Sequence, residues 1–147
     1  TGNLEYDKIV RELGLTDGKS FGEGSRIIKY EYDMPAVLAA ADLIICRAGA
    51  VSLAELAARE LPSILIPYPY ASGDHQTFNA RVFVKAEAAK MIADKYVTEK
   101  ELIQDINDFR HQPETLERMS EATKKIKKIY AGAGIAQLAL EMTENKK

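Results

Sequence analysis

The sequence is poor in the residues that build disulfides and metal sites. Cys46 is the only cysteine among 147 residues, and there are two histidines and no tryptophan. One cysteine excludes an internal disulfide and any metal site made of several thiolates, and it fits a reducing compartment. His75 and His111 are predicted on different elements, so neither a metal site nor a Ser-His-Asp triad is expected. No metal ion and no cofactor is therefore predicted, and Cys46 is interpreted as a small buried hydrophobe.

Long apolar runs and an excess of either charge are also absent. The apolar run at residues 63–66 is far shorter than the roughly 20 residues that a membrane-spanning helix needs. No charged-then-apolar leader opens the chain. The 20 basic and 22 acidic side chains give a net charge of -2, which provides no surface for wrapping nucleic acid. Any anionic ligand must then be bound by a local site.

The composition that remains is typical of one globular domain. The chain is 46% hydrophobic and long enough to bury a sizeable core. Hydrophobic periodicity and turn residues predict helices at residues 6–13, 33–41, 52–59 and 75–87, strands at 27–30, 43–46, 63–66 and 89–93, and three further helices. This alternation predicts an α/β fold, a Rossmann-like parallel sheet with helices on both faces and ligands at the carboxyl ends of the strands.

The turn after residues 43–46 is the first candidate binding site. The small residues 48–50 would let a ligand approach the backbone closely, and the first amides of the next helix would point outward without partners. Together with the helix dipole, these amides favour a phosphate, to which the Ser52 hydroxyl can also donate. Glu55, about one helical turn further, can accept hydrogen bonds from the vicinal hydroxyls of a ribose.

A purely structural interpretation of this turn is also open. Gly49 can serve only as a turn residue, Ser52 only as a helix cap and Glu55 only as a favourable acid in a first helical turn. Small-residue turns before helices are common in α/β folds. The turn alone therefore does not decide between the two interpretations.

A second polar stretch, residues 74–79, again follows a predicted strand and opens a helix. His75, Gln76 and Asn79 are costly to bury without partners but well suited to bind sugar hydroxyls and an acetamido group. The alternative is an N-terminal cap by Asp74 with a solvated polar face. Because loops after adjacent parallel strands flank one crevice, the two stretches are predicted to contact two ends of one ligand.

The order of these residues resembles the MurG family of bacterial N-acetylglucosaminyltransferases. The resemblance rests on one ordered signature: Ala-Asp-Leu-Ile-Ile-Cys-Arg-Ala-Gly-Ala at residues 41–50, Glu55, Leu61-Pro62, Pro67, and His-Gln-Xaa-Xaa-Asn-Ala at residues 75–80. It implies one half of a GT-B glycosyltransferase, in which residues 1–147 are the carboxyl-terminal UDP-GlcNAc-binding domain without its first strand and Gly-rich loop. The full protein is implied to be an inverting hexosyltransferase that converts lipid I to lipid II in peptidoglycan synthesis.

The resemblance also implies roles for individual residues. The backbone at the start of the helix would contact the diphosphate, Glu55 the ribose and Gln76 the sugar. The main chain of Glu31, where the family often has isoleucine, would contact uracil. The implied donor-binding residues are Glu31, Ala50, Val51, Ser52, Leu53, Ala54, Glu55, His75, Gln76 and Asn79.

Two features of the family are missing from the chain. They are the glycine-rich, histidine-containing loop of the acceptor domain and the Gly-Gly-Ser-type loop that opens the donor domain. The resemblance therefore implies no catalytic residue here and no activity of the chain alone. A missing amino-terminal domain would bind lipid I and the membrane surface, with the full protein in the cytoplasm at the inner face of the cell membrane. The start at Thr1, without an initiator Met, agrees with a fragment.

Two other functions fit the same pattern. One is another GT-B enzyme, such as a nucleotide-sugar epimerase or a glycolipid synthase. The other is a donor-binding subunit of a two-chain glycosyltransferase, which works only beside a membrane partner.

Overall fold

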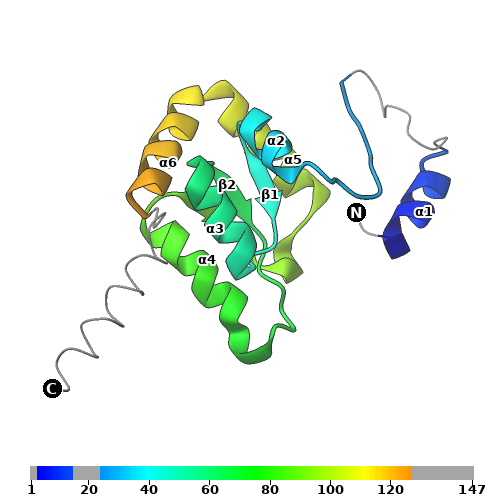
Figure 1. The fold of residues 1–147 in the computed structure, drawn as a ribbon, viewed down its shortest axis with the longest axis horizontal. Coiled ribbons are helices and arrows are strands. Elements are labelled where there is room, and N and C mark those ends of the chain that lie inside the picture. The colour runs from blue at the N-terminus through cyan, green and yellow to red at the C-terminus, as the bar shows by residue number, and fades with distance from the viewer. Residues whose placement is uncertain (1–2, 15–23, 127–147) are drawn as a thin grey trace, which may run out of the picture. The chain divides into compact units, whose positions relative to one another are not determined.

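The computed structural model describes residues 3–14 and 24–126. The chain divides into two compact units, Thr1–Val37 and Leu38–Lys147. The elements in chain order are α1 (Asn3–Glu12), α2 (Met34–Ala40), β1 (Ile44–Cys46), α3 (Ala50–Arg59), β2 (Ser63–Leu65), the 3-10 helix η1 (Ser72–Asp74), α4 (His75–Lys85), β3 (Ala89–Met91), the 3-10 helix η2 (Asp94–Tyr96), α5 (Glu99–His111) and α6 (Pro113–Ile126) (Figure 1).

In the first unit, α1 carries a buried aromatic side chain. Lys29 Nζ lies 5.9 Å from the ring centroid of Tyr6 and 3.8 Å from Asp7 Oδ1. Gly14, just after the helix, has a φ of 61°, a left-handed conformation that glycine adopts at little cost. The prediction of an opening helix closed by Gly14 is confirmed.

The prediction of a strand at residues 27–30 is wrong. These residues belong to no strand of the structure. An apolar sequence becomes a strand only when a neighbouring backbone supplies the hydrogen bonds of a ladder. Within the part of the chain that the structure describes, the sheet consists of β1, β2 and β3.

These three strands form a parallel sheet in the order β1-β2-β3. Ile64 of β2 is in register with Ile45 of β1 and Lys90 of β3. β2 is buried along its whole length, whereas Ile45 on β1 is 40% exposed. The chain passes from strand to strand through α3 and α4, which makes two βαβ units. The predicted α/β class is confirmed.

The main hydrophobic core lies where α3 packs against α4 and α6 (Figure 1). Leu65 of β2 meets Leu56 of α3, Phe83 of α4 and Ala122 of α6 in this core. α5 is linked to the sheet separately, because Asp105 of α5 pairs with Lys90 of β3 at 2.5 Å. Since Lys90 and Leu65 point to opposite faces of the sheet, helices lie on both faces.

The helix ends follow local sequence signals. Asp33 Oδ1 accepts a hydrogen bond from Ala36 N at 3.2 Å, which confirms the predicted cap of α2. Thr98 caps α5 in the same way. After α5 and α6, the last of the three predicted helices falls at residues 127–147 and lies outside the described residues. No helix among the residues that are described is long and apolar enough to cross a membrane.

The end of α4 provides a test of the backbone geometry. Glu87 has a φ of 62°, and its N–H donates to Val84 O at 2.9 Å. This conformation costs a non-glycine residue roughly 1–2 kcal/mol, which exceeds the roughly 0.5–1 kcal/mol of extra entropy that glycine loses on folding. Glu87→Gly should therefore raise the free energy of unfolding in urea by about 0.5 kcal/mol or more. Glu117→Gly, inside α6, is the control and should lower it by about 1 kcal/mol. If both variants lower the free energy of unfolding equally, the left-handed conformation of Glu87 at the end of α4 is contradicted.

Candidate functional site

The loops that follow the three strands begin at the same edge of the sheet, because the strands are parallel. The turn after β1 lies at this carboxyl edge and leads into α3. Gly49 occupies the N-cap position, and its carbonyl accepts the first helical hydrogen bond from Leu53 N at 3.0 Å. α3 thus begins at Ala50, two residues before the predicted start at Ser52.

The first amides of α3 are open. Neither a capping side chain nor another backbone group among the described residues accepts a hydrogen bond from Ala50 N, Val51 N or Ser52 N. The Val51 side chain is 74% exposed, so the surface around these amides is accessible. Unpaired amides at a helix N-terminus carry partial positive charge and bind anions.

Gly49 is not needed as a turn residue. Its φ of -66° and ψ of 145° are ordinary values for any amino acid. A Cβ atom built on Gly49 would meet nothing closer than Ser52 Oγ at 3.9 Å, which is a normal contact. Neither its backbone conformation nor its surroundings therefore require glycine at this position.

Ser52 and Glu55 lie on one side of α3, since residues three apart are neighbours on a helix surface. Ser52 is the third helical residue, so it is not the cap that the structural interpretation required. Glu55 is exposed, and no hydrogen bond or ion pair of its carboxylate is found in residues 3–14 and 24–126. The Leu53 side chain belongs to the hydrophobic core, so only its main chain could reach a ligand, whereas Ala54 is exposed.

The loop after β2 contains two successive left-handed residues. Gly73 has a φ of 61°, and a Cβ there would come within 3.1 Å of His75 Nε2. Asp74 has a φ of 54° and occupies the N-cap position of α4, but its side chain makes no capping hydrogen bond. Asp74 thus occupies the predicted cap position, but the predicted hydrogen bond from its side chain is not formed. His75, the first residue of α4, is exposed.

Gln76 connects the two candidate loops. Its Oε1 accepts hydrogen bonds from Ala48 N at 3.2 Å and from Tyr68 N at 3.0 Å. Two backbone donors fix this atom as the oxygen, so the amide nitrogen Nε2 is left to donate elsewhere. The prediction that the two polar stretches lie together is therefore confirmed, and a side chain links them directly.

Asn79 contacts the same turn. Its Nδ2 donates to Ala48 O at 3.3 Å. The sequence predicted Asn79 only as a neighbour of the sugar and did not reveal this bond. The spacing of Gln76 and Asn79 carried the signal, because residues three apart on a helix present their side chains to the same neighbour.

Arg47 is a second residue that the sequence analysis missed. Its Nη1 donates to Ile66 O and Pro67 O, both at 3.3 Å, and pairs with Asp94 of η2. Its guanidinium also lies 5.6 Å from the ring centroid of Tyr68. Arg47 thus joins the loops after all three strands, and its charge is already neutralised by Asp94. A single basic residue after a predicted strand does not indicate such long-range partners in the sequence.

The remaining sequence-predicted residues are less informative. Glu31 belongs to the first unit, where its Oε1 accepts from Asp33 N at 2.7 Å, and its contact with uracil stays a prediction. His111 lies on α5 with Nδ1 2.7 Å from Asn107 O, far along the chain from His75. Cys46 is half-buried against the hydrophobic core rather than fully buried as predicted, and this burial raises the pKa of its thiol. Within the described ranges, no group of three or more His, Cys, Asp or Glu could hold a metal ion.

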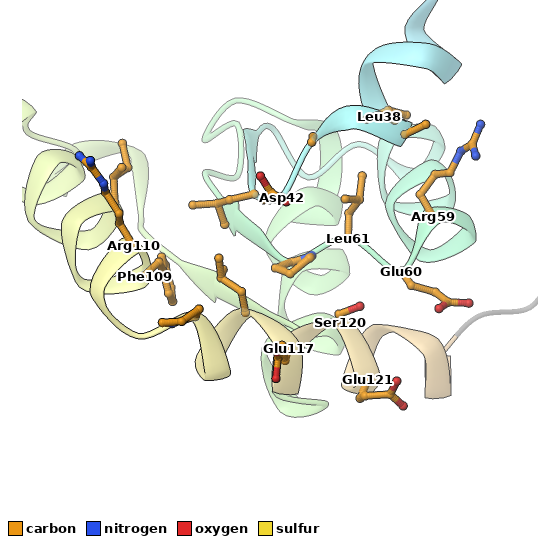
Figure 2. A pocket seen from close by; sticks show the side chains of 17 residues that line it. Leu38, Asp42, Arg59, Glu60, Leu61, Phe109, Arg110, Glu117, Ser120 and Glu121 are labelled. Atoms are coloured by element: carbon orange, nitrogen blue, oxygen red, sulfur yellow. The ribbon is translucent and has the colours of Figure 1, made fainter. Parts of the chain in front are cut away.

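One cavity among the described residues lies at the other edge of the sheet. Its volume is about 990 Å³, and it contains none of the predicted site residues. Asp42 precedes β1 and Leu61 precedes β2, so the cavity is at the amino ends of the strands, beside Phe109 of α5 and Glu117 of α6 (Figure 2). A smaller cavity of about 350 Å³ lies at the carboxyl edge, next to Tyr70, Asp74 and Asp94.

These features define a Rossmann-like α/β domain with open helix amides at its carboxyl edge. The chain belongs to the family described as "Glycosyltransferase family 28 C-terminal domain", whose family model matches residues 1–133. The resemblance to the MurG family is thereby confirmed.

Curated relatives agree with this assignment. The chain is 41% identical over 143 residues to the UDP-N-acetylglucosamine--N-acetylmuramyl-(pentapeptide) pyrophosphoryl-undecaprenol N-acetylglucosamine transferase of Thermoanaerobacter sp. (strain X514), covering 97% of this chain and 39% of the relative. It is 42% identical over 142 residues to the protein of the same name from Syntrophus aciditrophicus, covering 92% and 39%. The chain therefore spans about 39% of the length of these relatives.

A solved structure has the same fold. The crystal structure of MurG from Acinetobacter baumannii matches with a TM-score of 0.69 and 28% sequence identity. The match covers 78% of this chain and 33% of that one.

Gly49→Ala tests whether this glycine leaves space for a ligand. Alanine is less favoured than glycine at an N-cap, which lowers stability by roughly 1 kcal/mol. Alanine also reduces the entropy of the unfolded chain, which raises stability by a similar amount. The net change in stability should therefore be less than about 1 kcal/mol. The added methyl group should weaken the binding of UDP at least tenfold, or about 1.4 kcal/mol. Thermal unfolding and calorimetry on the complete protein measure the two effects. Unchanged affinity would return Gly49 to a purely structural role.

Proposed function

We propose that this chain binds UDP-GlcNAc as the donor half of an inverting N-acetylglucosaminyltransferase that converts lipid I to lipid II in peptidoglycan synthesis. One observation carries the proposal. At the start of α3, the amides of Ala50, Val51 and Ser52 are open beside a glycine that the protein's own packing does not require. A diphosphate accepts hydrogen bonds from such amides, and the helix dipole favours its negative charge. The names of the two relatives support UDP-GlcNAc as the donor.

The ribose would be bound by Glu55. This carboxylate is exposed and lies on the same side of α3 as Ser52, one turn from the proposed diphosphate position. A carboxylate can accept hydrogen bonds from both ribose hydroxyls. The contact of the Glu31 main chain with uracil is proposed from the family resemblance alone.

The sugar would be bound at the start of α4. Gln76 Oε1 is occupied by two backbone amides, so Gln76 would approach the sugar through Nε2 as a hydrogen-bond donor. Its partner on the ligand must then be an acceptor, such as a hydroxyl oxygen or the acetamido carbonyl. His75, which is exposed at the first position of α4, would lie beside Gln76 on the solvent side of the sugar.

The chemistry would be shared between this chain and the rest of the complete protein. When the bond from the sugar to UDP breaks, negative charge develops on the diphosphate, and the amides of α3 would stabilise it. The general base, the lipid I site and the membrane-facing surface would come from the other part. On this proposal, residues 1–147 are a carboxyl-terminal domain without its first strand and Gly-rich loop, and they are inactive alone. The complete protein would work at the cytoplasmic face of the cell membrane.

A calorimetric titration of the complete protein tests this function. UDP, UDP-GlcNAc, UDP-glucose and AMP are compared under the same conditions. The proposal predicts binding of the uridine nucleotides, preference for UDP-GlcNAc over UDP-glucose, and no binding of AMP. Equal binding of AMP and UDP, or no binding of UDP at millimolar concentration, would contradict it.

Glu55→Ala should remove the recognition of the ribose hydroxyls. The expected loss of UDP affinity is about 1–3 kcal/mol, because hydrogen bonds to a charged acceptor are lost. The affinity for 2′-deoxy-UDP, which lacks one of these hydroxyls, should fall less. Glu101→Ala, in the first turn of α5, is the control. If Glu55→Ala weakens both ligands by the same factor, Glu55 does not bind the 2′-hydroxyl.

Gln76→Glu separates the sugar contact from the loop contact. Glutamate keeps an oxygen that accepts from Ala48 N and Tyr68 N but loses the Nε2 donor. The variant should therefore lose about 1 kcal/mol more affinity for UDP-GlcNAc than for UDP. Gln76→Ala, which also removes the two backbone contacts, should weaken both ligands. If the ratio of the UDP-GlcNAc affinity to the UDP affinity is the same in Gln76→Glu as in the parent protein, Gln76 does not bind the sugar through Nε2.

A further inference from the structure

The cavity of about 350 Å³ at the carboxyl edge has no role in donor binding as proposed above. Tyr70, Asp74 and Thr77 line it from the segment between β2 and the first turn of α4. Asp94 and Lys95 line it from η2, which follows β3. The cavity thus lies between the loops after β2 and β3, whereas the open amides of α3 follow β1.

Tyr70 places an aromatic ring at this cavity that the protein's own packing hardly covers. Tyr70 is 82% exposed, compared with 44% for Tyr68. The two rings pack edge to face with their centroids 5.6 Å apart, and the guanidinium of Arg47 lies 5.6 Å from the centroid of the Tyr68 ring. Tyr68 N also donates to Gln76 Oε1. Tyr70 is therefore anchored two residues from a direct bond to the side chain that would bind the donor sugar.

The lining of the cavity combines two groups that bind carbohydrates. The face of an aromatic ring carries partial negative charge and packs well against the apolar C–H face of a pyranose. Asp74 is exposed and its side chain makes no capping bond, so its carboxylate can accept hydrogen bonds from sugar hydroxyls or an acetamido N–H. Asp94, in contrast, is already paired with Arg47. Tyr70 and Asp74 thus offer a stacking surface and a free acceptor to one sugar.

The order of the sites along the sheet indicates which sugar this is. In an inverting transfer the acceptor hydroxyl attacks C1 of the donor sugar from the side opposite the departing UDP. The hydroxyl oxygen bonds to C1, the bond from C1 to the UDP oxygen breaks with its electron pair going to UDP, and the hydroxyl proton goes to the general base. With the diphosphate at α3 and the donor sugar at Gln76, the acceptor approaches from the side away from α3, where the cavity lies.

We propose that Tyr70 and Asp74 bind the sugar that carries the attacking hydroxyl, the N-acetylmuramyl unit of lipid I. Tyr70 stacks on the ring of this sugar, and Asp74 accepts a hydrogen bond from it. The inference rests on the proposed function and extends it, because this chain then forms one side of an acceptor site whose remainder comes from the other part of the complete protein. The names of the two relatives include an N-acetylmuramyl acceptor.

Steady-state kinetics of the complete protein with a soluble, short-chain analogue of lipid I tests the role of Tyr70. Tyr70→Ala should raise the KM for the analogue about fivefold or more, because the stacking contact is lost. Calorimetry should show an unchanged affinity for UDP-GlcNAc. Tyr70→Phe keeps the ring and should have a KM close to that of the parent protein. Tyr96→Ala, at an exposed tyrosine that does not line the cavity, is the control and should leave the KM unchanged.

Asp74→Gly tests the hydrogen bond without disturbing the loop. Glycine adopts the φ of 54° at little cost and is accepted at an N-cap. The KM for the analogue should rise about tenfold or more, because a charged acceptor is lost. Glu87→Gly also replaces an acidic residue of left-handed conformation, but at the other end of α4, and as the matched control it should leave the KM unchanged.

A second analogue, which lacks the pentapeptide, locates the contact on the acceptor. If Tyr70 binds the sugar, Tyr70→Ala should raise the KM of both analogues by the same factor. A rise confined to the pentapeptide analogue would overturn the inference, and so would an unchanged KM in Tyr70→Ala or an equal weakening of UDP-GlcNAc. Failure of the parent protein to bind UDP would instead contradict the proposed function.

Discussion

Gln76 Oε1 accepts hydrogen bonds from two backbone amides, Ala48 N and Tyr68 N, that belong to loops after different strands. The parallel sheet brings β1 and β2 to a common edge, but it does not set the conformation of the loops beyond that edge. The bridge through Gln76 does so, because it joins both loops to the start of α4. Arg47 adds a second link, to the carbonyls of Ile66 and Pro67 and to Asp94. The geometry of the carboxyl edge therefore depends on side chains that bind backbone groups.

This arrangement explains why the start of α3 is open. Most helices satisfy their first amides with a capping side chain, and Thr98 does so for α5. Gly49 cannot, since it has no side chain, and neither its backbone conformation nor its surroundings require glycine. Helix amides without a protein partner bind water or a ligand. An anion supplies both the missing acceptors and the charge that the helix dipole favours.

Sequence patterns predicted those parts of the fold that depend on neighbours along the chain. The three described strands, the cap by Asp33 and the turn at Gly14 follow from apolar runs, capping residues and glycine. The strand at residues 27–30 was wrong, because a ladder needs a partner backbone that local sequence does not reveal. For the site, the sequence identified the two polar stretches and their proximity. It could not show that Asn79 binds Ala48 or that Arg47 pairs with Asp94, since these contacts depend on the tertiary fold.

The central claim is that the amides of Ala50, Val51 and Ser52 bind the diphosphate of a UDP donor. A crystal structure of the complete protein with UDP-GlcNAc tests it most directly. The account predicts phosphate oxygens about 2.7–3.2 Å from these amide nitrogens, the normal range for such hydrogen bonds, with Gln76 Nε2 on the sugar and Asn79 Nδ2 still on Ala48 O. A diphosphate bound elsewhere, with the start of α3 open to solvent, would contradict the account.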